Sequence, residues 1–83
     1  MEMITMEMVV CDASGAALAE GQQVSLALKR CPERRFGAKL GPGGLLRVEG
    51  IRANEIVLAE VQSGPRDKQR GEAEVGSRRL VVR

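Results

Sequence analysis

The chain has 83 residues, and its 13 Lys and Arg exceed its 11 Asp and Glu to give a net charge of +2. Residues 1–83 fit a single domain, and a domain this small buries only a little over ~60% of the surface that it exposes when unfolded. Phe36 is the only aromatic residue and His is absent, so aliphatic and Met side chains must form the core and no cofactor is expected. Such a core predicts a module that gains buried area from a second copy or a host protein.

Residues 3–11 alternate between apolar and more polar side chains, which is the period of a strand with one buried face. The same stretch has no basic leader and carries two acids, so it does not resemble a secretory signal, and no apolar run is long enough to span a membrane. We therefore expect a cytoplasmic protein without membrane association. The inward side chains of this strand are Ile4, Met6, Met8 and Val10.

Residues 12–23 are expected to form a loop with a short extended excursion. A helical turn over residues 16–19 is the alternative, but two glycines bracket too few residues for a stable helix. A second strand follows over residues 23–30, where apolar and polar side chains alternate again.

Pro32 cannot donate a hydrogen bond to a strand ladder, so residues 31–33 are expected to form a turn or a sheet edge. A third strand is predicted over residues 36–40, with Phe36 in the core. The Gly-Pro-Gly-Gly run at 41–44 then predicts a reversal, because its glycines can adopt positive φ and Pro42 fixes its own φ. A phosphate cradle is disfavoured there, because no Gly-Lys-Ser/Thr follows and the next element is a strand.

A fourth strand is predicted over residues 45–49 and is expected to end at Gly50. The strongest apolar run, residues 55–62, has two largely apolar faces, which is typical of a central strand covered by the core on one side and by a partner or loop on the other. Residues 63–71 are polar and predict an exposed loop. Residues 72–75 and 78–83 predict a closing hairpin.

Seven short strands with turn signals at nearly regular spacing predict an all-β fold. The favoured architecture is a small seven-stranded antiparallel sandwich, and a small β-barrel is the alternative. No long helix, internal repeat or low-complexity tract is present in the sequence.

The order of turns and strands resembles the transthyretin-like sandwiches called carboxypeptidase regulatory-like or Cna-B-type domains. The similar segments are residues 9–15, 18–26, 43–51 and 56–61, and together they span about two thirds of the chain. In that family a strand runs into Asp-x-x-Gly, a Val-x-Leu strand follows, and a Gly-bearing turn precedes a strand that ends at Gly-Leu. The resemblance implies a Greek-key sandwich and a noncatalytic attachment, stalk or regulatory module.

The charges are unevenly distributed along the chain. Residues 1–28 carry four acids and no Lys or Arg, whereas residues 29–83 carry thirteen Lys and Arg against seven acids. The basic residues occur in clusters that could bind a carboxylate or phosphate, although a solvated mixed-charge face is the favoured explanation. The candidate binding residues are Arg34, Arg35, Arg66, Lys68, Arg70, Arg78 and Arg79.

Catalysis and metal binding are not expected. Cys11 and Cys31 lack a His that could activate them as nucleophiles, and two thiols cannot complete an ordinary zinc site. If the first two strands are antiparallel neighbours, these cysteines lie far apart and stay reduced, although a different topology could bring them together.

A noncatalytic protein-interaction or structural module is therefore the favoured function. We expect self-association, with a dimer favoured, through an edge strand at residues 3–10 or 78–82, or else binding to another protein. Nucleic-acid binding through the basic clusters is the alternative. It is less favoured because no exposed aromatic residue is expected for stacking on bases, since Phe36 is assigned to the core.

Overall fold

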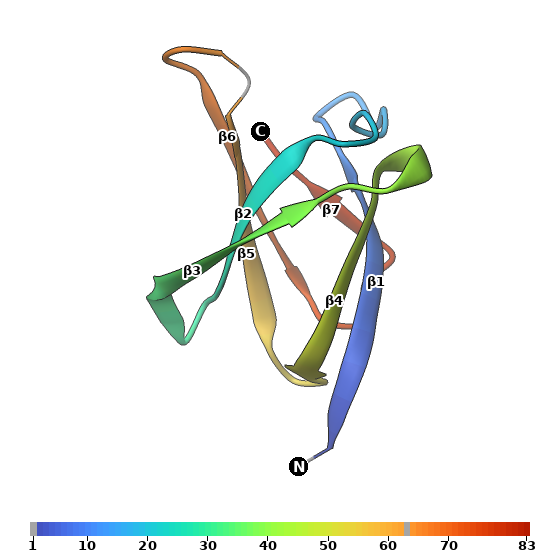
Figure 1. The fold of residues 1–83 in the computed structure, drawn as a ribbon, viewed down its shortest axis with the longest axis vertical. Helices are drawn as coiled ribbons and strands as arrows, with labels where there is room; N and C mark the ends of the chain where they lie inside the picture. Colours follow the sequence, from blue (N-terminus) through green and yellow to red (C-terminus); the bar gives the residue numbers. More distant parts are fainter. Residues whose placement is uncertain (1, 63) are drawn as a thin grey trace.

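A computed structural model describes residues 2–62 and 64–83. It contains two sheets, one of three strands in the order β4-β1-β7 and one of four strands in the order β3-β2-β5-β6 (Figure 1). The all-β sandwich is confirmed, and the barrel alternative is wrong because the sheets do not close into a barrel. The elements are β1 (Met3–Cys11), β2 (Gln23–Leu28), β3 (Cys31–Lys39), the 3₁₀ turn η1 (Pro42–Gly44), β4 (Leu45–Arg52), β5 (Ile56–Gln62), β6 (Lys68–Glu74) and β7 (Arg79–Val81).

The core lies between the two sheets and is built from aliphatic and Met side chains. Alternate residues of β1, β2 and β5 point into it, as their two-residue period predicts. The prediction that Phe36 belongs to the core is wrong, because its side chain is 42% exposed on the edge strand β3. The core residues are Met6, Met8, Val10, Val24, Leu26, Leu40, Leu46, Ile51, Val57, Ala59, Val61, Leu80 and Val82.

Gly50 does not end its strand as predicted but allows β4 to continue to Arg52. The partners of β1 along β4 jump from Val48 to Ile51 while β1 advances by only two residues, so β4 holds one extra residue in a bulge. Gly50 has φ +71°, which favours glycine at this position. Because of the extra residue, Ile51 returns to the buried face.

The turn predicted at residues 41–44 is confirmed, with η1 joining β3 to β4. Gly44 has φ +77°, and a Cβ on it would lie 3.0 Å from the Leu18 carbonyl oxygen. The loop that contains Leu18 is not helical, in agreement with the favoured prediction. Its start is held by Asp12, whose carboxylate accepts hydrogen bonds from Ser14 and from the Ala16 N–H.

Two further strand boundaries differ from the predictions, those at the starts of β3 and β6. Strand β3 begins at Cys31, five residues earlier than predicted, and Pro32 is tolerated because β3 is an edge strand. Strand β6 begins at Lys68, inside the predicted loop, of which Ser63 lies outside the described residues.

The predicted closing hairpin is wrong, and so is the expectation that every strand pair is antiparallel. Strand β6 pairs with β5 in the four-stranded sheet, whereas β7 pairs with β1 in the other sheet. The chain therefore crosses between the sheets after Glu74, and β7 runs parallel to β1.

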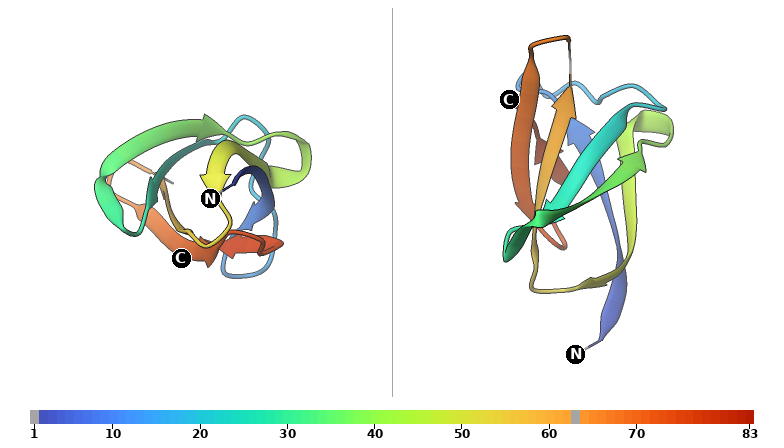
Figure 2. Two further views of the ribbon diagram at one scale, coloured as in Figure 1. Left: turned by 90° about the horizontal axis from the view of Figure 1, so that it is seen from below. Right: turned by 60° about the vertical axis from the view of Figure 1, so that its left-hand side comes forward.

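The two margins of the sandwich are built differently. At the β6/β7 margin, Arg70 and Arg83 exchange two backbone hydrogen bonds of 2.9 Å that link β6 to the end of the chain. At the opposite margin, no strand pairing joins β3 to β4 within residues 2–62 and 64–83. Figure 2 shows the layers from two further directions, with the start of β1 extending past the rest of the molecule.

Candidate binding surfaces

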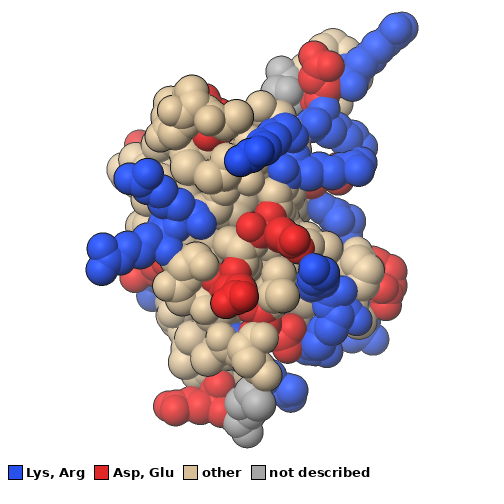
Figure 3. Space-filling view, turned by 180° about the vertical axis from the view of Figure 1, so that it is seen from behind, with Lys and Arg blue, Asp and Glu red and all other residues tan. Residues whose placement is uncertain are grey.

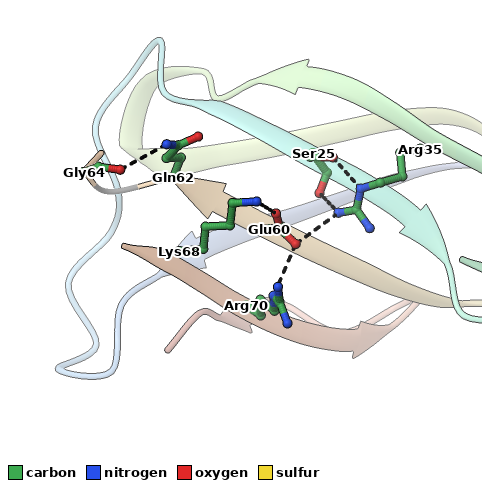
Figure 4. A network of polar contacts seen from close by, with 7 residues as sticks. All are labelled: Ser25, Arg35, Glu60, Gln62, Gly64, Lys68 and Arg70. Carbon is green, nitrogen blue, oxygen red and sulfur yellow. Dashed lines mark hydrogen bonds and ion pairs between the residues drawn. The ribbon is translucent and has the colours of Figure 1, made fainter. Parts of the chain in front are cut away.

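Three basic side chains surround one carboxylate on the outer face of the four-stranded sheet (Figure 4). The carboxylate of Glu60 lies 3.4 Å from Lys68 Nζ through Oε1 and 3.2 Å from Arg70 Nε through Oε2. Arg35 approaches the same Oε2 more loosely, with its Nη2 at 3.9 Å. We call these four residues the Glu60 cluster.

The register of the strands places the Glu60 cluster on one face. Glu60 lies opposite Arg70 of β6 and opposite Ser25 of β2. Arg35 reaches across β2, where its Nε donates to Ser25 Oγ (2.8 Å) and its Nη2 donates to the Ser25 carbonyl oxygen (3.3 Å). Contacts with Ser25 of β2 and Glu60 of β5 therefore fix the Arg35 side chain in the absence of a ligand.

The pKa of Glu60 is below its ordinary value of 4.5. Partial desolvation acts to raise this pKa, but the hydrogen bond from Lys68 and the positive charges of Lys68, Arg70 and Arg35 together outweigh it. The side chain is 22% exposed, so water screens these charges in part. Glu60 is accordingly an ionised anchor for three cations at neutral pH.

A shallow hollow of about 540 Å³ adjoins the Glu60 cluster. Leu58 lies half-buried in it, and charged side chains of β3, β5 and β6 surround it. The other outward apolar side chain of β5, Ile56, is also half-buried. The residues that line the hollow are Arg35, Leu58, Ala59, Glu60, Arg70, Gly71 and Glu72.

The structure brings together only three of the seven predicted binding residues, namely Arg35, Lys68 and Arg70. Arg34 lines a separate hollow with Phe36. Arg66 lies in the turn between β5 and β6, and Arg78 and Arg79 lie at the start of β7 in the other sheet.

Acidic side chains lie among the basic ones instead of leaving a continuous basic surface (Figure 3). Glu72 pairs with Lys29 at 3.3 Å, beside the Glu60 cluster on β6. Sequence reasoning missed these partners, although an acid inside the apolar run of residues 55–62 was a visible signal for Glu60.

Sequence reasoning also missed an ion pair between a turn and a nearly buried acid. Arg30 Nε donates to Glu55 Oε1 at 2.6 Å, and the Glu55 side chain is only 8% exposed. The pair connects the β2–β3 turn to the start of β5. It gives the buried carboxylate a charged partner, which a lone carboxylate there would lack.

Strand edges form the second kind of candidate surface. Strand β1 pairs with β4 along its length but with β7 only over Val9, Val10 and Cys11. The predicted edge at residues 3–10 is therefore an edge over residues 3–8 only. The predicted edge at residues 78–82 is covered on one side by β1 and adjoins the hydrogen bonds of the β6/β7 margin on the other.

The acids and cysteines of the described chain are the remaining candidates for metal or nucleophilic chemistry. Within residues 2–62 and 64–83, no group of three or more His, Cys, Asp or Glu side chains is placed to hold a metal ion. Cys11 and Cys31 are free thiols, the first buried and the second half-buried. Among the same residues, no helix has the length and apolarity needed to cross a membrane.

Comparison of the chain with protein-family models, with curated proteins and with solved structures finds no significant match.

Proposed function

We propose that the chain is a noncatalytic protein-interaction module that self-associates as a dimer through residues 3–8 of β1. The observation that carries this proposal is the unpaired side of β1 over residues 3–8. Within residues 2–62 and 64–83 no strand lies along this side until Val9, where β1 begins to pair with Arg79 of β7. An unpaired edge exposes backbone N–H and C=O groups that a second strand can bind. The resemblance to transthyretin-like sandwiches, which are mostly noncatalytic modules, also supports it.

The unpaired edges differ in how well they are protected against pairing. Strand β3 carries Pro32 and four charged residues, and β4 carries three charged residues and the bulge at Gly50. Charges, proline and bulges are the features that keep an edge strand from pairing. Residues 3–8 contain Glu7 as their only charge, and Met3 is 58% exposed. This edge is therefore the least protected of the three.

Backbone directions along β1 support the same edge. The Val9 N–H points toward β7 and donates to the Arg78 carbonyl oxygen at 2.9 Å. Because alternate residues of a strand direct their N–H groups to the same side, Glu7 and Thr5 present theirs to the unpaired side. An antiparallel pairing of two copies centred on Thr5 places Glu7 opposite Met3 and keeps the two carboxylates apart.

The test is a charge at the centre of this pairing. Thr5 is exposed, so Thr5→Lys should fold normally while placing two ammonium groups side by side in the dimer. We expect its dimer dissociation constant to rise at least about tenfold, or about 1.4 kcal/mol, by light scattering and analytical ultracentrifugation over a dilution series. Ala19→Lys, with the same charge change on an exposed loop residue, is the matched control.

A folded monomer of the unmodified chain at every micromolar concentration would contradict self-association. A dimer that Thr5→Lys and Ala19→Lys leave equally intact would contradict this edge. The free thiols Cys11 and Cys31 fit a reducing compartment, so a cytoplasmic location remains part of the proposal. Nucleic-acid binding is less favoured, because Glu60 and Glu72 lie among the basic side chains that would meet phosphates.

A further inference from the structure

The outer face of the four-stranded sheet carries more positive charge than its own acids neutralise around Glu60. Three cations share this one carboxylate, and the Arg70 side chain is 72% exposed. Arg70 contacts Glu60 through Nε, so its two terminal nitrogens have no partner within residues 2–62 and 64–83. Arg35 uses Nε and Nη2, so its Nη1 is likewise available among those residues.

The two guanidinium groups border the same hollow on one face of the sheet, and they come from its two outermost strands. Arg35 comes from β3 and Arg70 from β6, and both approach the same oxygen of Glu60. Leu58 lies half-buried in the hollow between them. The site therefore combines one bidentate donor, the two terminal nitrogens of Arg70, and a second donor, Nη1 of Arg35, with an aliphatic contact surface.

The neighbouring charges decide which anion fits. Glu72 lines the hollow, and Glu74 lies two residues further along β6 on the same face. A polyphosphate chain lying along this strand would therefore meet two carboxylates. A single carboxylate that enters between Arg35 and Arg70 avoids them. Successive side chains of an extended peptide point to opposite faces, so an aliphatic side chain two residues from that carboxylate lies on the same face and can cover Leu58.

We propose that this hollow binds an extended peptide segment of a partner protein in which an aliphatic residue stands two positions after a Glu or Asp. The carboxylate binds Arg35 and Arg70, and the aliphatic side chain lies on Leu58. The hollow is in the other sheet from β1, so the proposal goes beyond self-association and does not depend on it.

The experiment is a titration of the ¹⁵N-labelled protein, followed by amide chemical shifts. The probe is the capped peptide Gly-Thr-Glu-Thr-Leu-Gly, and its control carries Gln in place of Glu. We expect saturable shifts at Leu58, Glu60, Arg70 and Gly71, with the Gln peptide binding at least about tenfold more weakly. Repeating the titration in Thr5→Lys, with the same result, separates this site from the dimer.

Three variants sharpen the titration. Arg70→Gln should weaken binding about tenfold, whereas Arg79→Gln, which removes the same charge from the other sheet, should leave it unchanged. Glu60→Gln should strengthen binding severalfold, because Glu60 competes with the peptide carboxylate for both arginines. All three positions are on the surface, and a thermal melt checks that each variant folds.

Several results would overturn the proposal. These are equal affinities for the Glu and Gln peptides, shifts centred outside this face, an equal loss in Arg70→Gln and Arg79→Gln, and unchanged or weaker binding in Glu60→Gln. Inorganic phosphate that produces the same shifts with the affinity of the Glu peptide would also overturn it, because the site would then recognise an anion and not a peptide.

Discussion

At the β6/β7 margin the two sheets are joined through the backbone, whereas at the β3/β4 margin no strand of residues 2–62 and 64–83 pairs with the outer side of β3 or of β4. The first margin contains the Arg70–Arg83 hydrogen bonds and the close contact of Gly71 with Val81. The second contains an almost fully exposed β3. One short chain thus closes one side of its core with main-chain contacts and leaves the other side accessible.

The difference follows from side-chain size at two glycines. A Cβ on Gly71 would overlap the Val81 carbonyl oxygen, so only glycine at this position lets β6 and β7 come so close. A Cβ on Gly37 of β3 would have nothing within 4 Å among the described residues, because it would point out of the sheet into open space. Joining the sheets at the β6/β7 margin therefore requires a glycine at position 71, whereas the β3/β4 margin has room for a side chain at position 37.

Gly71→Ala is the sharpest way to break this comparison and has the largest expected effect. The added methyl group must push β6 away from β7, which we expect to lower the free energy of unfolding by roughly 3 kcal/mol or more in a chemical denaturation experiment. Gly37→Ala is the matched control. It should change stability by less than about 1 kcal/mol and can stabilise, because Ala orders a strand better than Gly does. Equal losses at both glycines would refute the contrast between the margins.

Arg30→Ala removes the Arg30–Glu55 ion pair next to the β3/β4 margin and should have an intermediate effect on stability. It leaves the Glu55 carboxylate without its charged partner at a position only 8% exposed. We expect a loss of about 1–3 kcal/mol in the free energy of unfolding. Arg34→Ala, an exposed arginine of β3, is the control and should cost less than about 0.5 kcal/mol. A negligible loss in Arg30→Ala would show that Glu55 finds water instead.

The sequence was most informative where one face of a strand is buried. The alternation in β1 and β2 predicted their positions and their inward side chains, because burial selects every second residue. The apolar run at residues 55–62 predicted the position of β5 but not which of its faces lies inward. Strand β6 lacks that signal, since the residues on its inward face are Gln69, Gly71 and Ala73. Position 71 requires glycine because its backbone lies against Val81, and this contact depends on the fold and not on the local sequence.

The candidate site was predictable only as a composition. Arg35, Lys68 and Arg70 were identified as basic residues, but their convergence on Glu60 depends on β5 lying between β2 and β6. That order is a long-range pairing, which periodicity does not encode. The parallel pairing of β7 with β1 was missed for the same reason, because two nearby segments at the chain end predicted a hairpin.

The Glu60 cluster links β3 at the open margin to β6 at the closed one, and its pH dependence is the smallest expected effect. Its neighbouring cations keep the pKa of Glu60 below 4.5, so the folded state binds a proton less readily than the unfolded state. The resulting stabilisation is fully present above about pH 4.5 and is lost as the pH falls through the lower, folded-state pKa.

Glu60→Gln should therefore be less stable than the unmodified chain at pH 7, and the difference should shrink steadily as the pH falls from 4.5 toward 3 in chemical denaturation experiments. High salt should shrink it at pH 7 as well, because the cluster is partly exposed. Glu20→Gln removes one carboxylate from an exposed loop and serves as the control. A difference that stays constant from pH 7 to pH 3 would mean that Glu60 stabilises the sheet by its shape and hydrogen bonds, and that its charge does not connect the two margins.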